Sequence, residues 1–285
     1  MSTTATTTAV RAGLFRGWIE YRQSFRSVQD LFGYFSVPLI FLVIAISTGG
    51  EEIDETGAAL GAMMMAGAGA FLLAMAGVAS VAQVLATERE DGTLLRAKAV
   101  PKGMLGYFIG KAVHIVLITV TSFVILLVPA SLLVDGFSMN GAGGLLTLVW
   151  LIVLGLLATA PIGAVIGSLV TNPRLATGII MLPMMALVMI SGIFVPVEIL
   201  PDWLRSIGQV FPLFWIGLGM RSVFLPDSAV AAEVGESWRH LETAGILGAW
   251  AIVGLIVAPF VLRRMARRES GARVQAAREK AMQRA

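Results

Sequence analysis

The residues with the most potential for chemistry lie in one stretch, ATEREDGTLLRAKAVPKG, residues 86–103. Three carboxylates and four basic side chains share these eighteen positions, although only 14% of the chain is charged. A short polar segment with both charge signs can form ion pairs in a groove of a soluble partner, and it can equally be a solvated loop. The elements on either side decide where such a segment can lie.

The spacing within this stretch predicts a short helix. Thr87 and Glu90 fit a capping box, in which a hydroxyl residue is followed three positions later by Glu. The acidic residues suit the positive start of a helix, the basic residues that follow suit its end, and Pro101 would terminate it. Gly92 and Thr93 could instead restart the helix, which would then be bent.

Other kinds of chemistry lack the residues they need. The chain has no cysteine and no H-E-x-x-H or G-x-S-x-G motif, and Gly110-Lys111 is followed by alanine instead of the Ser or Thr of a phosphate-binding loop. His114 and His240 fall near opposite ends of apolar runs and cannot share a metal. We therefore expect no catalytic, cofactor-binding or metal-binding residues, and no ATP hydrolysis by this chain itself.

The apolar runs predict an integral membrane protein of the all-α class. The chain is 57% hydrophobic with a mean hydropathy of +0.84, so it cannot cover itself with polar surface as a soluble domain does. A membrane span needs roughly 20 mostly apolar residues. Six runs fit, and none has an acidic or basic residue at its centre: 33–48, 58–85, 107–134, 142–170, 175–195 and 244–262. The predicted domains are a cytoplasmic arm over 1–32, a six-span domain over 33–262 and a basic tail over 263–285.

The basic residues sort to one side of these spans. All of them except Arg205, Arg221 and Arg239 lie in the N-terminal arm, at the second and fourth connections or in the tail. Because cytoplasmic loops carry the excess of Lys and Arg, both termini and the charged stretch are predicted to lie in the cytoplasm. We expect a multi-pass protein of the bacterial cell membrane.

Two further segments are predicted to lie at the membrane surfaces. The N-terminal arm carries an apolar stripe with helical spacing: Leu14, Trp18, Tyr21, Phe25, Val28 and Phe32. This favours an amphipathic helix in the cytoplasmic interface, with packing against another subunit as the alternative. On the outer side, prolines divide residues 195–227, which predicts short helices that enter the membrane partway and are buried against protein.

The order of these features resembles the type 2 ABC transporter permease family. Glu88-Arg89-Glu90, Gly92-Thr93-Leu94 and Pro101 resemble its E-R-E-x-G-T-L…P motif, and a second block resembles its outer re-entrant segment. The second block consists of Ser191-Gly192, Pro196, Leu200-Pro201, Trp203-Leu204, Pro212 and Arg221. The chain departs at Ala97 and Lys98, near which the family usually has leucine, and at Phe211, where it usually has Asn. The drug and antibiotic exporter branch, of the daunorubicin-resistance type, is the most similar.

The resemblance implies a membrane subunit of an ATP-driven exporter. In that family the first motif forms a coupling helix, here about 87–101, that contacts an ATPase subunit. The coupling residues would then be Thr87, Glu88, Arg89, Glu90, Gly92, Thr93, Leu94 and Pro101. The outer segment, about 196–226, would include Pro196, Pro201, Trp203, Pro212 and Arg221. The implied partners are two cytoplasmic ATPase subunits that bind ATP and Mg, a second permease subunit, identical or homologous, and membrane lipids, with no nucleic acid.

Methionines indicate where cargo could pass. The second and fifth spans, which flank the pathway in the family that this chain resembles, hold eight of the fourteen methionines. Flexible, polarizable methionine suits a surface that adapts to several apolar shapes, although it also fills gaps between helices. The predicted pathway residues are Met64, Met181, Met185, Met189 and Phe194, and the predicted cargo is an amphipathic or apolar drug, antibiotic or lipid-like compound. A lipid-linked polysaccharide or glycolipid permease, and a passive channel or scaffold, are the alternatives.

Overall fold

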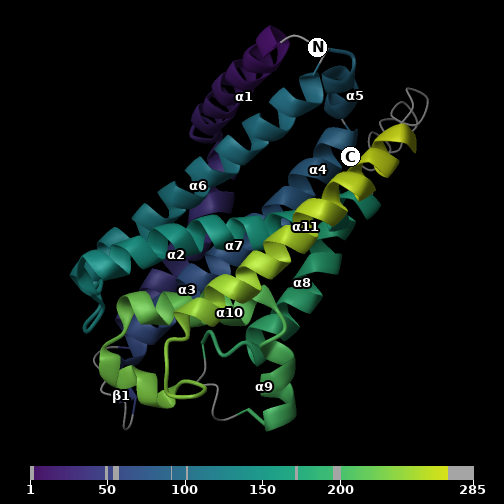
Figure 1. Ribbon diagram of the computed structural model, residues 1–285. Coiled ribbons are helices and arrows are strands. Elements are labelled where there is room, and N and C mark those ends of the chain that lie inside the picture. Colours follow the sequence, from purple (N-terminus) through teal and green to yellow (C-terminus); the bar gives the residue numbers. More distant parts are fainter. Residues whose placement is uncertain are drawn as a thin grey trace.

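The computed structural model describes residues 3–48, 51–53, 58–90, 92–100, 102–170, 173–194 and 200–268, which form a helical bundle (Figure 1). Among these residues, five helices are long and apolar enough to cross a membrane. They are α2 (Val28–Ser47), the continuous helix Leu60–Arg89, α6 (Gly103–Leu133), α7 (Gly141–Leu169) and α11 (His240–Arg268). The prediction of an all-α integral membrane protein is confirmed.

The predicted fifth and outer segments are shorter and more broken. The fifth span corresponds to α8 (Pro173–Ile190), whose apolar part covers Gly178–Ile190. After it come α9 (Asp202–Gly208) and α10 (Pro212–Phe224), which meet at an angle of 90° and would add a sixth crossing if they formed one broken span. A 3-10 turn, η3 (Asp227–Ala232), then leads toward α11.

The N-terminal apolar stripe does not form one helix. The first helix, α1 (Thr3–Ser24), ends before Phe25, and α2 begins at Val28, where the Ser27 hydroxyl caps the new helix by accepting a hydrogen bond from the Asp30 amide at 3.2 Å. The prediction of an unbroken amphipathic helix through Phe32 was therefore wrong. The first spanning helix also begins five residues earlier than the predicted start at residue 33.

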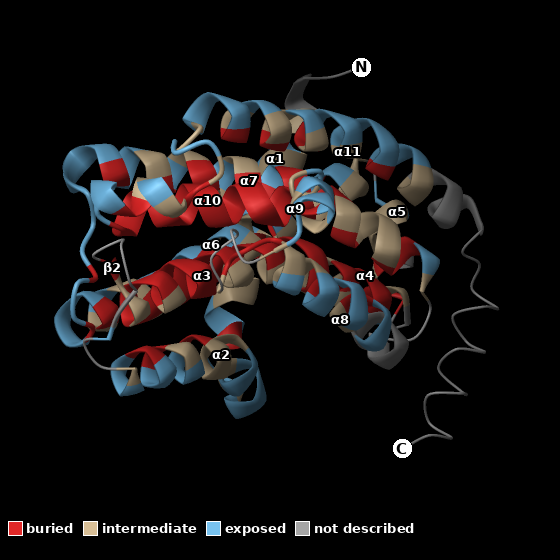
Figure 2. Cartoon of the chain, turned by 90° about the horizontal axis from the view of Figure 1, so that it is seen from below, coloured by how far each residue is buried: buried red, intermediate tan, exposed pale blue. Residues whose placement is uncertain are grey.

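The centre of the bundle is the helix formed by the second run. It consists of α3 (Leu60–Met75), a π-helical turn η1 (Ala76–Ser80) and α4 (Val81–Glu90). Of the 18 residues in its most apolar stretch, 56% are buried, against 17% in the corresponding stretches of α2 and α11. Figure 2 shows the same contrast, with buried residues concentrated along α3, α4 and α10. Small residues of α7 make the close contact: a methyl on Gly167 would lie 2.7 Å from the Ala82 carbonyl oxygen.

Different elements lie at the two ends of the bundle. The start of α1, the short helix α5 (Thr93–Lys98) and the last turns of α11 lie at one end (Figure 1). The opposite end holds α9 and a small antiparallel pair of strands, β1 (Glu52–Ile53) and β2 (Ala58–Ala59). The charged stretch of residues 86–103 therefore lies at the same end as the first and last helical turns.

Candidate functional site

A glycine contact joins α1 to the start of α6. Gly13 and Gly17 of α1 face Gly106 and Gly110 of α6, each pair spaced by four residues. A methyl on Gly13 would lie 2.6 Å from the Gly106 carbonyl oxygen, and one on Gly17 would lie 2.5 Å from that of Gly110. The backbones thus approach as in G-x-x-x-G helix pairs. The sequence contains both motifs, but the prediction of an amphipathic helix in the cytoplasmic interface, or packed on another subunit, did not use them.

Beside this contact, four charged side chains form one ion network. Lys111 of α6 lies 2.7 Å from a Glu20 carboxylate oxygen of α1 and 2.5 Å from one of Glu88 in α4. Arg16 of α1 lies 2.7 Å from Glu20 and 3.6 Å from Glu88, and its guanidinium lies 5.3 Å from the centroid of the Tyr107 ring. The network therefore joins α4 and α6 to α1, which is far from both in sequence.

The network keeps its α1 members ionised. Burial alone would raise the pKa of the Glu20 carboxyl, but hydrogen bonds from Lys111 and Arg16 outweigh it and hold that pKa below its ordinary value. Burial lowers the pKa of Arg16, whereas its hydrogen bond to Glu20 and the charges of Glu20 and Glu88 raise it, with a net upward shift. Opposite charges thus stabilise each other at the end of the bundle.

Arg89 makes a second anchor, to α7. Its guanidinium donates hydrogen bonds to the carbonyl oxygens of Ser168 at 2.8 Å and Val170 at 3.2 Å. These carbonyls belong to the last turn of α7, where no helical amide is left to bond them and where positive charge is favoured. Neighbouring residues of the E-R-E motif therefore bind different helices, Glu88 toward α1 and α6, and Arg89 toward α7.

The predicted start of the coupling helix at Thr87 is wrong. Thr87 lies inside α4, which continues without a break from the second span, so Glu88 and Glu90 lie in the last turn of a helix and do not begin one. The alternative restart is confirmed: Gly92 adopts a left-handed φ of 74°, and α5 begins at Thr93. The side chain of Glu90 and all of Pro101 lie outside the described residues.

The short helix α5 has a buried and an open face. Leu94 is almost completely buried and packs with Leu85 and Tyr107. Arg96 is exposed, and at the end of the segment 59% of Val100 is exposed. The helix is thus held on the bundle by one side, and its other side lies open at the end of the molecule.

At the opposite end, one residue predicted for the outer segment, Arg221, takes part in a buried ion pair. Arg221 of α10 forms a bidentate pair with Glu233 and also donates to the Gly192 carbonyl oxygen at 2.9 Å. Pro212 begins α10, Pro201 precedes α9, and Trp203 is exposed, whereas Pro196 lies outside the described residues. Arg221 therefore holds α10 to Glu233 and to the backbone at Gly192. The sequence did not indicate Glu233 as its partner.

The predicted pathway residues occupy different environments. Met181 lines a cavity, Met64 packs beside the main core, and Met185 and Met189 are exposed on α8, Met189 by 69%. Phe194 stacks on Phe41 with ring centroids 5.1 Å apart. The structure does not bring all five into one site of a single chain. Within the described residues, no group of three or more His, Asp or Glu could hold a metal ion.

This architecture is that of a multi-span helical membrane protein with an anchored, charged turn at one end. Residues 23–260 match the family model described as ABC-2 family transporter protein, and the chain belongs to this family. The resemblance of the sequence to the type 2 ABC transporter permease family is thereby confirmed. The chain is similar to "Probable multidrug ABC transporter permease YbhR" of Escherichia coli strain K12, with 26% identity over 167 residues. It is equally similar to the protein of the same name in E. coli O157:H7. The match covers 59% of this chain but only 45% of each relative.

Proposed function

We propose that this chain is the permease subunit of an ATP-driven exporter that moves an amphipathic or apolar compound out of the cytoplasm or the inner leaflet. The observation that carries the proposal is α5, a short helix that is anchored on one side and open on the other, in a protein of a transporter family. The name of the E. coli relative, a multidrug permease, supports the cargo class.

The contacts that hold α5 and the end of α4 on the bundle determine which helices would move together with α5. Closure of two ATPase subunits on bound ATP and Mg would press on the open face of α5. Leu94 is buried against Leu85 of α4 and Tyr107 of α6, so a displacement of α5 would displace these two helices through direct packing. Glu88 and Arg89 would pass it on to α1, α6 and α7, because their ion pairs and hydrogen bonds end on those helices.

The same proposal assigns sides and partners. The end that holds α5, the start of α1 and the last turns of α11 faces the cytoplasm, because most basic residues lie there. The complete transporter contains two ATPase subunits and a second permease subunit, identical or homologous. Met185 and Met189, exposed on α8, are available to cargo or to the second permease.

Charge reversal on α5 tests the proposal. Arg96→Glu changes the exposed face of α5, whereas Arg22→Glu makes the same change on the exposed side of α1, away from α5. We expect Arg96→Glu to lower cargo-stimulated ATP hydrolysis and export of the assembled transporter at least fivefold, with normal insertion, and Arg22→Glu to leave both within twofold. Full stimulation in the Arg96→Glu variant would contradict the proposal.

A further inference from the structure

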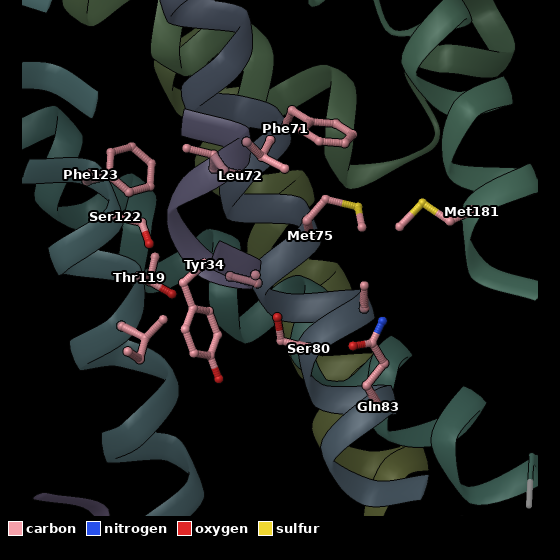
Figure 3. A pocket seen from close by; sticks show the side chains of 15 residues that line it. Tyr34, Phe71, Leu72, Met75, Ser80, Gln83, Thr119, Ser122, Phe123 and Met181 are labelled. Carbon is pink, nitrogen blue, oxygen red and sulfur yellow. The ribbon is translucent and has the colours of Figure 1, made fainter. Parts of the chain in front are cut away.

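A half-open cavity of about 360 Å³ lies between α2, α6, α8 and the central helix (Figure 3). Five of its lining side chains carry hydroxyl or amide groups: Tyr34, Ser80, Gln83, Thr119 and Ser122. Most of the others are apolar, and none of the described residues that line it is Asp, Glu, Lys, Arg or His. Its volume falls in the range of small-molecule sites, which combine apolar walls with a few polar groups.

One polar atom in the wall of this cavity lacks a partner. Thr119 is only 3% exposed, and its hydroxyl oxygen has no hydrogen-bond partner among the described residues. Two residues further along α6, the Thr121 hydroxyl donates to the Leu117 carbonyl oxygen at 2.8 Å and lies 2.8 Å from the Tyr21 hydroxyl. Because an unsatisfied buried hydroxyl costs free energy, a ligand in the cavity that offers the Thr119 hydroxyl a hydrogen bond would remove that cost.

The wall opposite Thr119 contains the π-helical turn η1, which contributes Ala76, Ala79 and Ser80 to the lining. Short π-helical turns occur frequently at functional sites. Met75, just before this turn, and Met181 of α8 point toward each other in Figure 3. Their flexible side chains can adapt to the shape of a ligand between them.

We propose that this cavity binds an uncharged amphipathic molecule that carries at least one hydrogen-bonding group, and that this molecule is cargo. The assignment as cargo rests on the proposed function. A cation or an anion would lose its hydration without meeting an opposite charge, so the lining selects against ions. Thr119 and Ser80 supply hydroxyl groups for a polar group, while Phe71 and Phe123 supply apolar contacts.

Of the predicted pathway residues, Met181 lines the cavity, and Phe194 lies next to Phe71, which also lines it. The Phe71 ring lies 6.5 Å from Phe194 and 5.8 Å from Phe41 between centroids, and only Phe71 of these three lines the cavity. The aromatic cluster thus connects the cavity to Phe194.

Single cysteines test access to the cavity, because the chain has none of its own. The 285-residue chain is reconstituted without the ATPase in lipid nanodiscs. It carries either Thr119→Cys or the matched Val120→Cys, which lies on the exposed side of the same helix. We expect uncharged methyl methanethiosulfonate to modify the cysteine at 119 at least tenfold faster than its trimethylammonium-ethyl analogue, after both rates are normalised to an exposed Ser138→Cys variant. Nile Red, an uncharged amphipathic dye, should slow modification at 119 at least threefold and leave 120 unchanged. Equal normalised rates for the two reagents at 119, or no selective protection by the dye, would overturn the proposal.

Removal of the hydroxyl alone supplies a second measurement. Thr119→Val should weaken the binding of Nile Red to the reconstituted permease about fivefold, whereas Thr121→Val should change it less than twofold, because the Thr121 hydroxyl is already bonded. Unchanged affinity in Thr119→Val would overturn the role of this hydroxyl. These experiments use the permease alone, so their failure leaves the Arg96 test unaffected, and failure of the Arg96 test leaves the binding result standing.

Discussion

Both ends of the bundle contain basic residues paired with carboxylates, but the two arrangements differ in kind. At the α10 end, Arg221 and Glu233 form a single pair with side chains only 2% and 6% exposed. At the α5 end, Lys111 and Arg16 share Glu20 and Glu88, and the Lys111 side chain is 15% exposed and that of Arg16 34%. A single buried pair has no substitute partner, whereas a shared and partly hydrated network does.

This difference indicates which end can move. Separation of Arg221 from Glu233 would leave charges without partners in a low-dielectric interior, which is strongly unfavourable. In the network, a carboxylate that loses one cation still faces another, and water reaches part of it. We therefore expect the α10 end to stay rigid while the α5 end rearranges, as transmission of a push from an ATPase would require.

The largest effect is expected from Arg221→Met. The change leaves Glu233 buried without its partner and should cost about 3–5 kcal/mol of unfolding free energy. Thermal unfolding of the purified protein in detergent measures it. The double variant Arg221→Met with Glu233→Leu removes both charges and should recover at least half of the lost stability. If the Arg221→Met variant were as stable as the unchanged protein, the buried pair would not be what makes the α10 end rigid.

Lys111→Met should be less severe. Glu20 and Glu88 lose their common partner but keep Arg16, so the expected cost is about 1.5–3 kcal/mol. Lys111→Arg preserves the charge and serves as the control. The same thermal unfolding measurement ranks the two ends, and a larger loss for Lys111→Met than for Arg221→Met would reverse the proposed difference between them.

Gly17→Ala probes the glycine contact that holds α1 beside the network. The added methyl would lie 2.5 Å from the Gly110 carbonyl oxygen and 2.7 Å from Val113 Cβ, so α1 must shift, at a cost of about 1–3 kcal/mol. Gly245→Ala in α11 meets nothing within 4 Å and should be neutral or stabilising. Faster proteolysis near α1 in Gly17→Ala alone would confirm the shift, and equal proteolysis of both variants would refute it.

The smallest effect is the pH dependence of the network. Because the pKa of Glu20 is lowered in the folded protein, its ion pairs contribute fully above the ordinary value of 4.5 and are lost as pH falls through the lowered pKa. The difference in melting temperature between the unchanged protein and Glu20→Gln should therefore be constant near neutral pH and shrink at strongly acidic pH. A difference that already shrinks between pH 7 and 6 would contradict this assignment.

Hydropathy predicted the helical membrane fold, since burial in lipid is encoded residue by residue. Local patterns were less reliable at the helix ends. The capping-box pattern at Thr87 was overridden because the helix of the second span continues into it, and the contacts of Glu88 and Arg89 with other helices hold that continuation in place. The break at residues 25–27 was missed because the hydrophobic period continues across it.

The contacts that build the candidate site were harder to predict, because they join distant parts of the chain. Glu20 and Lys111 lie 91 residues apart, and nothing local to either one indicates the other. The G-x-x-x-G motifs of α1 and α6 were a usable signal, since both stand in the sequence at the spacing of close helix pairs. Arg221 was identified from the family resemblance, but its partner Glu233 required the fold.

We propose that the open face of α5 contacts the ATPase, and site-specific photocrosslinking tests this contact most directly. A benzophenone amino acid replaces Val100, which is 59% exposed beside α5, or Trp203, which is 64% exposed on α9 at the opposite end. Irradiated membranes from cells that also express the ATPase should yield an adduct from position 100 that mass spectrometry identifies as the ATPase subunit, and none from position 203. An ATPase adduct from position 203 would contradict this contact. So would the lack of an ATPase adduct from position 100 in membranes from which the permease and the ATPase still copurify.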